Sequence, residues 1–372
     1  MARIQLSMSG EGRGHATRVR AVVEALKPEH EITIHAAGDA HDLLAPLYEG
    51  TDVAVRRIEG LRFSYTSSRR VDVWRTAWAA GTFLRGMREK VARLARAMES
   101  DRPDLVIADF EPLLPRAAKS LGIPFLSLTH QHFLLTYDLR SLPLWLRMHT
   151  LYMRGVVAAY YQGQRESVVS SFYFPPLRPG VRGVTQVGVM LRAGIRNNRP
   201  ADDGHLLVYL RRFAGKGLLT ALETTRRPVK VYGLGAHPPH RNLVFREIDE
   251  SRFLSDLATC SALISTAGNQ LVGEALYWRK PVLALPEAGN YEQFINAHFL
   301  RQSGGGDWCP LERVDQDVLS LFLRRLGTFR KNIDPERLDG LPATLGVIER
   351  FLGKPAVARR SRVEKVPELV AA

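Results

Sequence analysis

The sequence predicts an α/β protein with two doubly wound domains that face each other. The chain has 372 residues, about twice the size of a typical single domain. Short apolar segments alternate with helical patterns in both halves, which is typical of parallel sheets with right-handed crossovers. A segment rich in turn-forming residues separates the halves. We therefore expect two similar sheets, each with its own core.

The first domain, predicted for residues 1–178, follows a strand, helix, strand order. Its first strand leads through a glycine-rich turn into a helix whose apolar residues, from Val19 to Leu26, lie on one face. A long helix later in this domain stops at Pro103. The expected strands cover 3–8, 32–36, 104–108 and 124–128.

The second domain is predicted for residues 201–353, after a linker at 179–200. The linker is inferred from paired prolines, glycines and asparagines with little periodicity. Residues 354–372 are basic and lack an apolar face, so we expect a mobile tail. The strands expected in the second domain cover 206–210, 229–232, 243–245, 262–265 and 282–285.

Composition narrows the functional class. The two cysteines, Cys260 and Cys309, provide neither a disulfide framework nor a metal cluster, and no apolar stretch reaches the roughly 18 residues of a membrane span. We therefore expect a cytoplasmic protein. The net charge of +14 favours an anionic partner. The basic residues are dispersed and carry no known nucleic-acid motif, so we expect no specific nucleic-acid binding.

Two polar residues are expected at one edge of the first sheet. His15 follows the first strand and Asp109 ends a buried one, and open α/β sheets bind ligands at the carboxyl ends of their strands. A histidine oriented by a carboxylate can remove a proton from a hydroxyl group. Two alternatives stay open: His15 packs at a helix start, or Asp109 caps the helix at Leu113. The glycine spacing near Gly14 does not fit a dinucleotide fingerprint, so we exclude NAD.

The segment from Leu263 to Glu274 predicts a phosphate site. It reads as an apolar strand, a glycine turn and a helix start, where free backbone amides and the helix dipole favour a diphosphate. Gly268 would allow close approach, while the neighbouring polar side chains would add hydrogen bonds. Glu274 would reach a ribose diol or be a solvated acid. Glu292 and Gln293 follow the next strand and could hold sugar hydroxyls.

This segment resembles the donor signature of GT-B glycosyltransferases, which have two Rossmann-like domains. The resemblance extends to Pro281, Pro286, Glu292-Gln293 and Asn296-Ala297. The similar proteins are the UDP-glucuronosyl and UDP-glucosyl transferases, the macrolide glycosyltransferases and the family 28 peptidoglycan lipid-intermediate N-acetylglucosaminyltransferase. The resemblance implies an inverting, metal-independent hexosyl transfer with a nucleotide-sugar donor, expected to be a UDP-sugar, and no further cofactor.

The resemblance also implies roles for individual residues. His15 would be the base and Asp109 its partner, both in the acceptor domain. On the donor side, Gly14 belongs to the N-terminal loop, Ile248 would meet the nucleobase through its backbone, Glu274 would bind the ribose, and Glu292 with Gln293 would bind the sugar. The diphosphate would contact Thr266, Ala267, Gly268, Asn269 and Gln270.

One position departs from the family pattern. Thr266 stands where plant and animal members usually carry histidine, so a cationic contact to the phosphate is missing. Arg211 and Arg212, after the first strand of the second domain, could supply that charge. The alternative is that these arginines are solvated.

The acceptor half is less specific. His130, Gln131 and His132 follow the strand at 124–128 and are expected to contact the acceptor, without a third ligand that would suggest a metal. Between 133 and 174, apolar and aromatic residues are interleaved with arginines. This pattern fits contact with an anionic membrane on the cytoplasmic face, a pocket for a lipid-linked or small apolar acceptor, or a helix packed on its own domain.

Two other functions compete with glycosyl transfer. A non-hydrolysing nucleotide-sugar 2-epimerase has the same architecture and would use carboxylates around the sugar. A non-catalytic binder of sugar nucleotides or polyanions would fit the high charge and Thr266.

Overall fold

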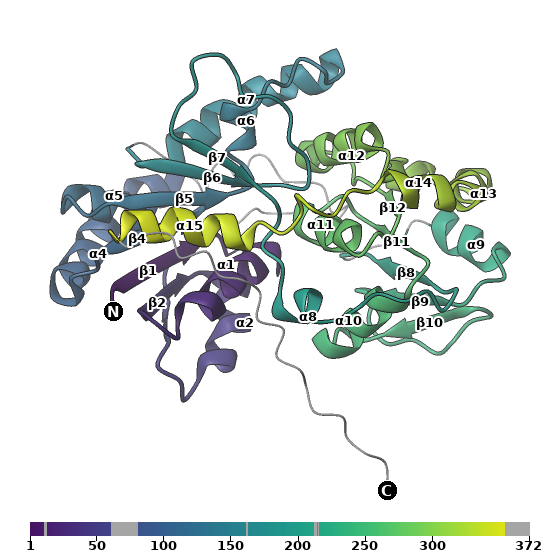
Figure 1. Ribbon diagram of the computed structural model, residues 1–372, viewed down its shortest axis with the longest axis horizontal. Coiled ribbons are helices and arrows are strands. Elements are labelled where there is room, and N and C mark those ends of the chain that lie inside the picture. Colours follow the sequence, from purple (N-terminus) through teal and green to yellow (C-terminus); the bar gives the residue numbers. More distant parts are fainter. Residues whose placement is uncertain (11–12, 61–80, 161–162, 212–213, 215, 354–372) are drawn as a thin grey trace, which may run out of the picture.

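The computed structural model describes residues 1–10, 13–60, 81–160, 163–211, 214 and 216–353. Over these residues the predicted fold class is confirmed: two parallel sheets lie side by side with helices around them (Figure 1). The predicted tail, together with Gly12 and Arg212, lies outside the described residues. Among the described helices, none is both long and apolar enough to cross a bilayer.

The first sheet has seven parallel strands in the order β3-β2-β1-β4-β5-β6-β7. Strands β4 and β5 are buried throughout, as expected for apolar strands covered on both faces. The strands are β1 Arg3–Met8, β2 Glu31–Ala36, β3 Ala54–Arg57, β4 Leu105–Asp109, β5 Phe125–Thr129, β6 Glu166–Ser170 and β7 Val184–Val187.

Helices cover this sheet on both sides. The predicted apolar face of the first helix is buried, because Val19, Val22 and Leu26 pack against Ile4 and Leu6 of the sheet. The helices described in this half are α1 Arg13–Leu26, α2 Gly38–Tyr48, α4 Met87–Asp101, α5 Leu113–Ser120, α6 Phe133–Thr136 and α7 Leu144–Tyr160.

The second sheet has six parallel strands in the order β10-β9-β8-β11-β12-β13. Its strands are β8 Leu206–Tyr209, β9 Val229–Tyr232, β10 Leu243–Arg246, β11 Ala262–Ser265, β12 Val282–Ala284 and β13 Gly306–Trp308. The remaining helices are α8 Ala193–Arg196, α9 Lys216–Thr224, α10 Glu250–Thr259, α11 Asn269–Tyr277, α12 Tyr291–Ser303, α13 Gln316–Arg324, α14 Leu326–Asn332 and α15 Leu341–Phe351, with a short 3₁₀ turn at Leu311–Arg313.

Two segments differ from the predicted domain boundaries. The predicted linker, 179–200, contains β7, whose residues are only partly buried at the edge of the first sheet. The predicted second domain, 201–353, contains α15, which returns to the first half and lies across it in yellow (Figure 1). Leu341, Val347 and Ile348 of this helix belong to the core of the first sheet.

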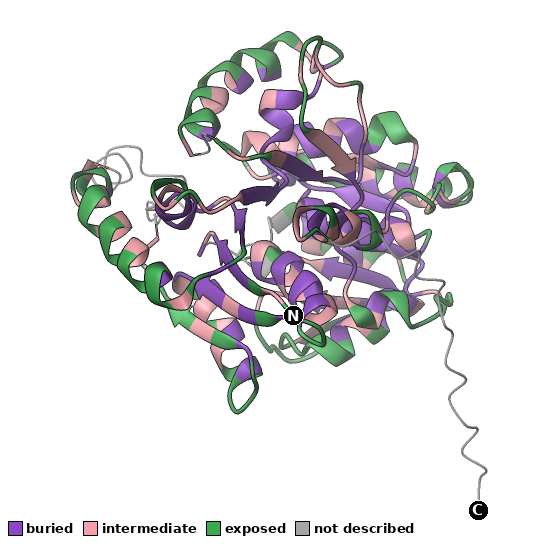
Figure 2. Ribbon diagram, turned by 60° about the vertical axis from the view of Figure 1, so that its left-hand side comes forward, coloured by how far each residue is buried: buried purple, intermediate pink, exposed green. Residues whose placement is uncertain are grey.

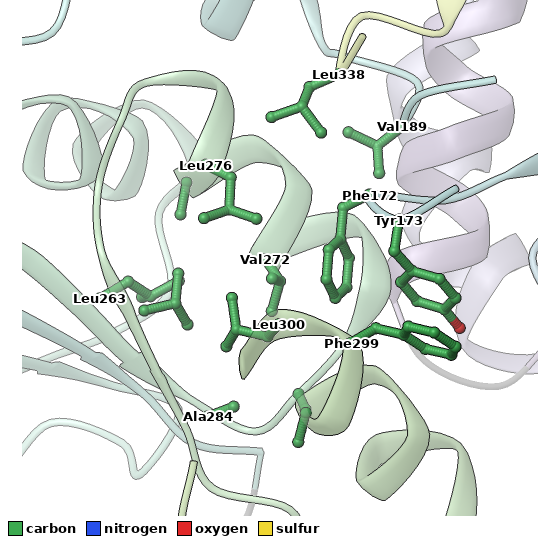
Figure 3. Packing of buried hydrophobic residues seen from close by; sticks show 14 of the residues in the cluster. Phe172, Tyr173, Val189, Leu263, Val272, Leu276, Ala284, Phe299, Leu300 and Leu338 are labelled. Atoms are coloured by element: carbon green, nitrogen blue, oxygen red, sulfur yellow. The ribbon is translucent and has the colours of Figure 1, made fainter. Parts of the chain in front are cut away.

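The two halves share a third apolar cluster in addition to their own cores. Buried residues run through the centre of both halves (Figure 2). In the shared cluster, Phe172 and Tyr173 after β6 meet Val272 of α11 and Phe299 of α12 (Figure 3). The rings of Tyr173 and Phe299 stack with centroids 4.2 Å apart. The halves are therefore joined by packing as well as by the chain.

Each sheet has one point where its strand order reverses. In the first sheet this point lies between β1 and β4, and in the second between β8 and β11. Ligands of open α/β sheets bind outside the carboxyl ends of the strands at such points. The sites predicted from the sequence follow β1, β4 and β11, so they lie at these two positions.

Candidate active site

His15 and Asp109 meet at the switch point of the first sheet. His15 lies in the first turn of α1, directly after β1, and Asp109 is the last residue of β4. The Nδ1 atom of His15 and the Oδ2 atom of Asp109 are 3.0 Å apart, although the two groups are not aligned as a full hydrogen bond. The His15 side chain keeps 13% exposure while that of Asp109 is fully buried. The predicted pair is thus adjacent in space.

Arg18 completes a three-residue arrangement around Asp109. It lies one helical turn after His15, and its Nη1 is 2.7 Å from Asp109 Oδ1. Burial opposes ionisation of Asp109, but the charges of Arg18 and His15 outweigh it and lower the pKa of this carboxyl. The carboxylate therefore stays charged and presents one oxygen to each partner.

The alternative role of Asp109 as a helix cap is taken by Glu111. The two Glu111 oxygens accept hydrogen bonds from the backbone amides of Leu113 and Leu114, at 2.6 and 2.9 Å. Burial raises the pKa of Glu111 despite these bonds. Between the two acids, Phe110 has a φ of 53°, which is uncommon for a residue with a side chain. This turn separates the capping acid from the acid that faces His15.

A row of rings leads from His15 to the end of α7. The His15 and Phe110 rings are parallel, with centroids 6.3 Å apart, and Phe110 stacks on Tyr160 at 4.5 Å. Tyr160 is the last residue of α7. An aromatic surface therefore borders the candidate base on the side of the acceptor half.

The predicted acceptor residues are mostly engaged inside the protein. His130 is fully buried, with Nδ1 3.0 Å from the Ser170 carbonyl and Nε2 3.0 Å from Asn296 Oδ1, and burial lowers its pKa. His132 is also buried, beside Ser127 and Ser167. Both histidines thus lie beneath the surface, and their contact with an acceptor stays a prediction.

Gln131 and Asn296 connect the two halves. The Gln131 amide donates to Glu292 of α12 at 3.2 Å, which places this predicted acceptor residue beside a predicted sugar residue. Asn296 Oδ1 also accepts the Tyr173 hydroxyl at 3.0 Å, and its Nδ2 donates to the Ala267 carbonyl at 2.9 Å. The Asn-Ala pair of the signature thus has a structural role at the interface.

The N-terminus of α11 lies at the switch point of the second sheet. Gly268 occupies the N-cap position without a side-chain cap, after β11 and the buried Thr266 and Ala267. A Cβ atom added at Gly268 would meet nothing within 4 Å. The first amides of a helix have no partner within it and favour an anion. Helices α1 and α11 pack against each other, so the base and this anion site lie in the first turns of two helices that are in contact.

The side chains that follow Gly268 face the first half. Asn269 Nδ2 donates to the Ser170 carbonyl at 3.1 Å, and Asn269 Oδ1 accepts from the Phe172 amide at 3.3 Å. Gln270 Nε2 donates to the Met190 carbonyl at 2.7 Å. Both amide side chains are thus engaged with the first half, and their contact with a diphosphate stays a prediction. The backbone of the turn remains the candidate contact.

Glu274, the predicted ribose ligand, is part of a buried ion pair. Its two oxygens lie 2.9 and 2.6 Å from Nε and Nη2 of Arg192, which precedes α8, and Gln270 Nε2 is 3.0 Å away. Arg192 also contacts Glu250 at 3.2 Å, and Glu250 pairs with Arg20 of α1 at 2.6 Å. Burial opposes the charge of Arg192, but Glu274 and Glu250 raise its pKa. Glu274 is therefore not a solvated acid.

The remaining predicted donor residues differ in accessibility. Gln293 is buried and bonds to Glu287, with its Oε1 2.8 Å from the Glu287 amide, whereas Glu292 is partly exposed beside Gln131. Ile248 is 39% exposed after β10, in the position expected for a base-reading segment. Gly14 and Arg211 are exposed, at the carboxyl ends of β1 and β8.

Sequence reasoning missed Arg18, Phe110 and Arg192. Arg18 could have been found from its spacing, because residues three apart on a helix share a face with each other. The left-handed backbone of Phe110 gives no signal in the sequence. Arg192 stood in the predicted linker, and its pairing with Glu274 depends on how the two halves fold together.

Comparisons with known proteins agree with this fold. The profile of the family described as Glycosyl transferase family 1 matches residues 2–327. Among solved structures, the fold is similar to CalG4, the calicheamicin glycosyltransferase, with a TM-score of 0.67 and 16% identity over 96% of this chain and 100% of that one. No curated protein matches the sequence.

Two further structures have the same fold. MurG of Acinetobacter baumannii has a TM-score of 0.60 and 15% identity, over 95% of this chain and 100% of that one. LpCGTa, solved in complex with UDP, has a TM-score of 0.67 and 17% identity, over 95% and 99%. Because the family profile covers most of the sequence, the chain belongs to Glycosyl transferase family 1 and is a glycosyltransferase of the GT-B fold.

Proposed function

We propose that this protein transfers a sugar from a nucleoside diphosphate sugar to a hydroxyl acceptor, with inversion at the anomeric carbon. One observation carries the proposal: the His15–Asp109 pair and the uncapped N-terminus of α11 lie at the switch points of two sheets whose helices α1 and α11 are in contact. A base and an anion site in the first turns of two contacting helices suit a reaction that removes a proton and releases a diphosphate.

In the proposed reaction, His15 removes the proton from the acceptor hydroxyl through Nε2, because Nδ1 faces Asp109. The acceptor oxygen forms a bond to the anomeric carbon while the bond from that carbon to the diphosphate oxygen breaks on the opposite face. The electron pair leaves with the diphosphate, which the amides at the start of α11 stabilise. Asp109 stabilises the protonated ring until the proton leaves.

The proposed donor is a UDP-sugar, and no metal takes part. Support comes from the fold shared with LpCGTa, which binds UDP, and from the open space at Gly268. The exposed Arg211 lies at the end of β8 beside β11, where it can approach the diphosphate and replace the charge that Thr266 lacks. Glu292 is the proposed contact for the donor sugar.

The decisive experiment pairs a donor panel with two histidine variants. We expect His15→Ala to lose at least about 100-fold in transfer rate while its thermal stabilisation by the donor persists. His41→Ala is the matched control, because His41 has a similar exposure of 17% and also lies beside a carboxylate, Asp42. Full turnover by His15→Ala, or retained anomeric configuration in the product, would contradict the proposal. Epimerisation without an acceptor would identify the rival enzyme.

The proposed acceptor is apolar or lipid-linked and reaches the site along α7. One face of this helix exposes large apolar side chains, and it carries arginines but no acidic residue. The helix ends at Tyr160, in the ring row that leads to His15. The exposed residues are Leu144, Trp145, Met148, Leu151, Tyr152 and Val156, with exposures between 43% and 79%.

This face suits peripheral contact with an anionic membrane. On a helix with 3.6 residues per turn, these six residues span one continuous stripe, while Leu146, Thr150 and Val157 are buried on the opposite side. Arg147 flanks the stripe, and apolar insertion together with basic flanks favours an acidic bilayer surface. We place this contact on the cytoplasmic face.

Vesicle binding tests the membrane contact separately from catalysis. We expect the protein to sediment with vesicles of phosphatidylglycerol and phosphatidylcholine and less with phosphatidylcholine alone. Leu151→Glu should reduce this binding about tenfold or more, because a charge replaces apolar area that becomes buried when the helix inserts into the bilayer. Leu321→Glu on α13 is the control, as Leu321 is 49% exposed in the other half. Equal sedimentation of both variants would remove α7 as the membrane contact.

A further inference from the structure

Arg18 is a buried arginine to which the proposed reaction assigns no role. Its side chain is 4% exposed, and Nη1 lies 2.7 Å from Asp109 Oδ1. Because both residues lie on α1, three positions apart, Arg18 and His15 approach the same carboxylate from one helix face. Each of the two carboxylate oxygens therefore has its own cationic or ionisable partner.

Among the residues that the structure describes, few other charges surround Asp109. The side chains that act on it are Arg18 and His15 of α1 and the Thr129 hydroxyl at the end of β5. His130 is a further titratable group of this region, and the charges of Arg18 and of Glu292 on α12 act on its pKa in opposite directions. Glu111, which follows on the same loop, is held by backbone amides. Arg18 is thus the permanent positive charge that acts most strongly on Asp109.

We propose that Arg18 is a positioning residue of the transfer reaction, which acts through Asp109. It anchors Oδ1 so that Oδ2 faces His15 Nδ1, and its charge keeps the buried carboxylate ionised. The second function matters because an isolated buried carboxyl tends to take up a proton. This inference rests on the proposed function, since it assigns Asp109 to the orientation of the base.

The alternative is that Arg18 only stabilises the fold. Both roles predict lower stability when Arg18 is removed, since loss of one partner leaves a buried charge alone. Only the positioning role predicts a change in the pH dependence of catalysis. Without the guanidinium, burial raises the pKa of Asp109, so the carboxylate is lost at a higher pH as the solution is acidified.

The first experiment compares pH profiles of kcat/KM for Arg18→Met, Arg18→Lys and Lys27→Met. We expect Arg18→Met to move the acid limb of the profile to higher pH by at least about one unit, since a nearby opposite charge lowers a carboxyl pKa by about one to three units. Arg18→Lys keeps the positive charge, so its acid limb should lie close to that of the wild type. Lys27→Met is the control, because Lys27 follows α1, is half-exposed and pairs with Glu24 at 2.8 Å.

A double variant keeps the test usable if Arg18→Met folds poorly. Arg18→Met combined with Asp109→Asn leaves no unpaired buried carboxylate, so it should fold better than the single variant. If Arg18 acts through Asp109, the pH profile of this double variant matches that of Asp109→Asn alone. A further change in the double variant would overturn the proposal.

A second readout needs no substrate, so failure of the proposed function can be told apart from failure of this inference. In ligand-free protein labelled with ¹³C at aspartate carboxyl carbons, the Asp109 signal should titrate at higher pH in Arg18→Met than in the wild type. An unchanged Asp109 titration would show that Arg18 is structural only. If the titration moves but no transfer occurs with any donor, the proposed function fails while the coupling of Arg18 to Asp109 stands.

Discussion

Replacing Arg192 with methionine should leave the Glu274 carboxylate buried beside one neutral donor. In the wild type, two nitrogens of Arg192 lie 2.9 and 2.6 Å from the two oxygens of Glu274, which is 1% exposed. After the change, Gln270 Nε2 at 3.0 Å is the remaining described partner. Removing one member of a buried ion pair costs about 3 to 5 kcal/mol, because the other charge stays buried without compensation. We expect Arg192→Met to lower the free energy of unfolding by about 3 kcal/mol.

The assay is a double-mutant cycle measured by urea unfolding. The double variant Arg192→Met, Glu274→Gln removes both charges, so it should recover most of the stability that the single variant loses. Arg196→Met is the matched control from α8, because Arg196 pairs with Asp339 at 2.9 Å but is 38% exposed. An exposed pair contributes about 1 kcal/mol or less.

Two results would refute this reasoning. Equal stability of Arg192→Met and Arg196→Met would mean that Glu274 is not buried with its partner. A double variant no more stable than Arg192→Met would mean that Arg192 does not stabilise the protein by compensating the charge of Glu274. Donor affinity in the Glu274→Gln variant would then show separately whether this acid contacts the ribose, as the family resemblance implies.

Three further predictions concern the donor turn, the interface and acid stability. Gly268→Ala should unfold like the wild type, since its Cβ meets nothing within 4 Å, but should bind the donor more weakly when binding is measured by calorimetry. Gly273→Ala is the contrast, because its Cβ would lie 2.4 Å from Val189 and should destabilise the protein. Asn296→Ala should cost about 2 to 4 kcal/mol in urea unfolding, because it removes three buried hydrogen bonds, two of which join the halves. Burial lowers the pKa of His35 and His132 from 6.5 to about 4, so the unfolded chain binds protons in this window that the folded protein does not. Stability should therefore fall as the pH falls from 6.5 towards 4, by roughly 2 kcal/mol per histidine at about pH 5, and replacing both residues with asparagine should flatten this slope.

The central strands were predictable because each is a continuous apolar run. All nine strands expected from the sequence are present within a residue or two at their ends. The strands that were not expected are β3, β6, β7 and β13, and three of these are short and only partly buried. A short, partly exposed strand lacks the apolar pattern on which the prediction depends, and its existence is decided by the neighbouring strand.

The candidate site was predictable where topology alone brings residues together. His15 and Asp109 follow strands that pair directly, so their meeting follows from the strand order. The contacts of His130 and Glu274 could not be predicted in this way. Both depend on residues more than 80 positions away, in the other half for His130 and in the connecting segment for Glu274, and a sequence pattern contains no information on that packing.

The position of α15 has a consequence for the order in which the protein matures during synthesis. This helix is made last among the described elements, yet Leu341, Val347 and Ile348 complete the apolar core of the first sheet. The shared cluster likewise needs Phe299 before Tyr173 is covered. The half that leaves the ribosome first is therefore the half that is finished last.

Until residue 351 has emerged, the first sheet has apolar surface open to water, and a nascent chain in that state is a natural client for chaperones. A fragment that ends at β7 should accordingly aggregate, whereas adding α15 as a separate peptide should help to keep it in solution. Helix α15 thus covers apolar surface of the sheet that begins with β1.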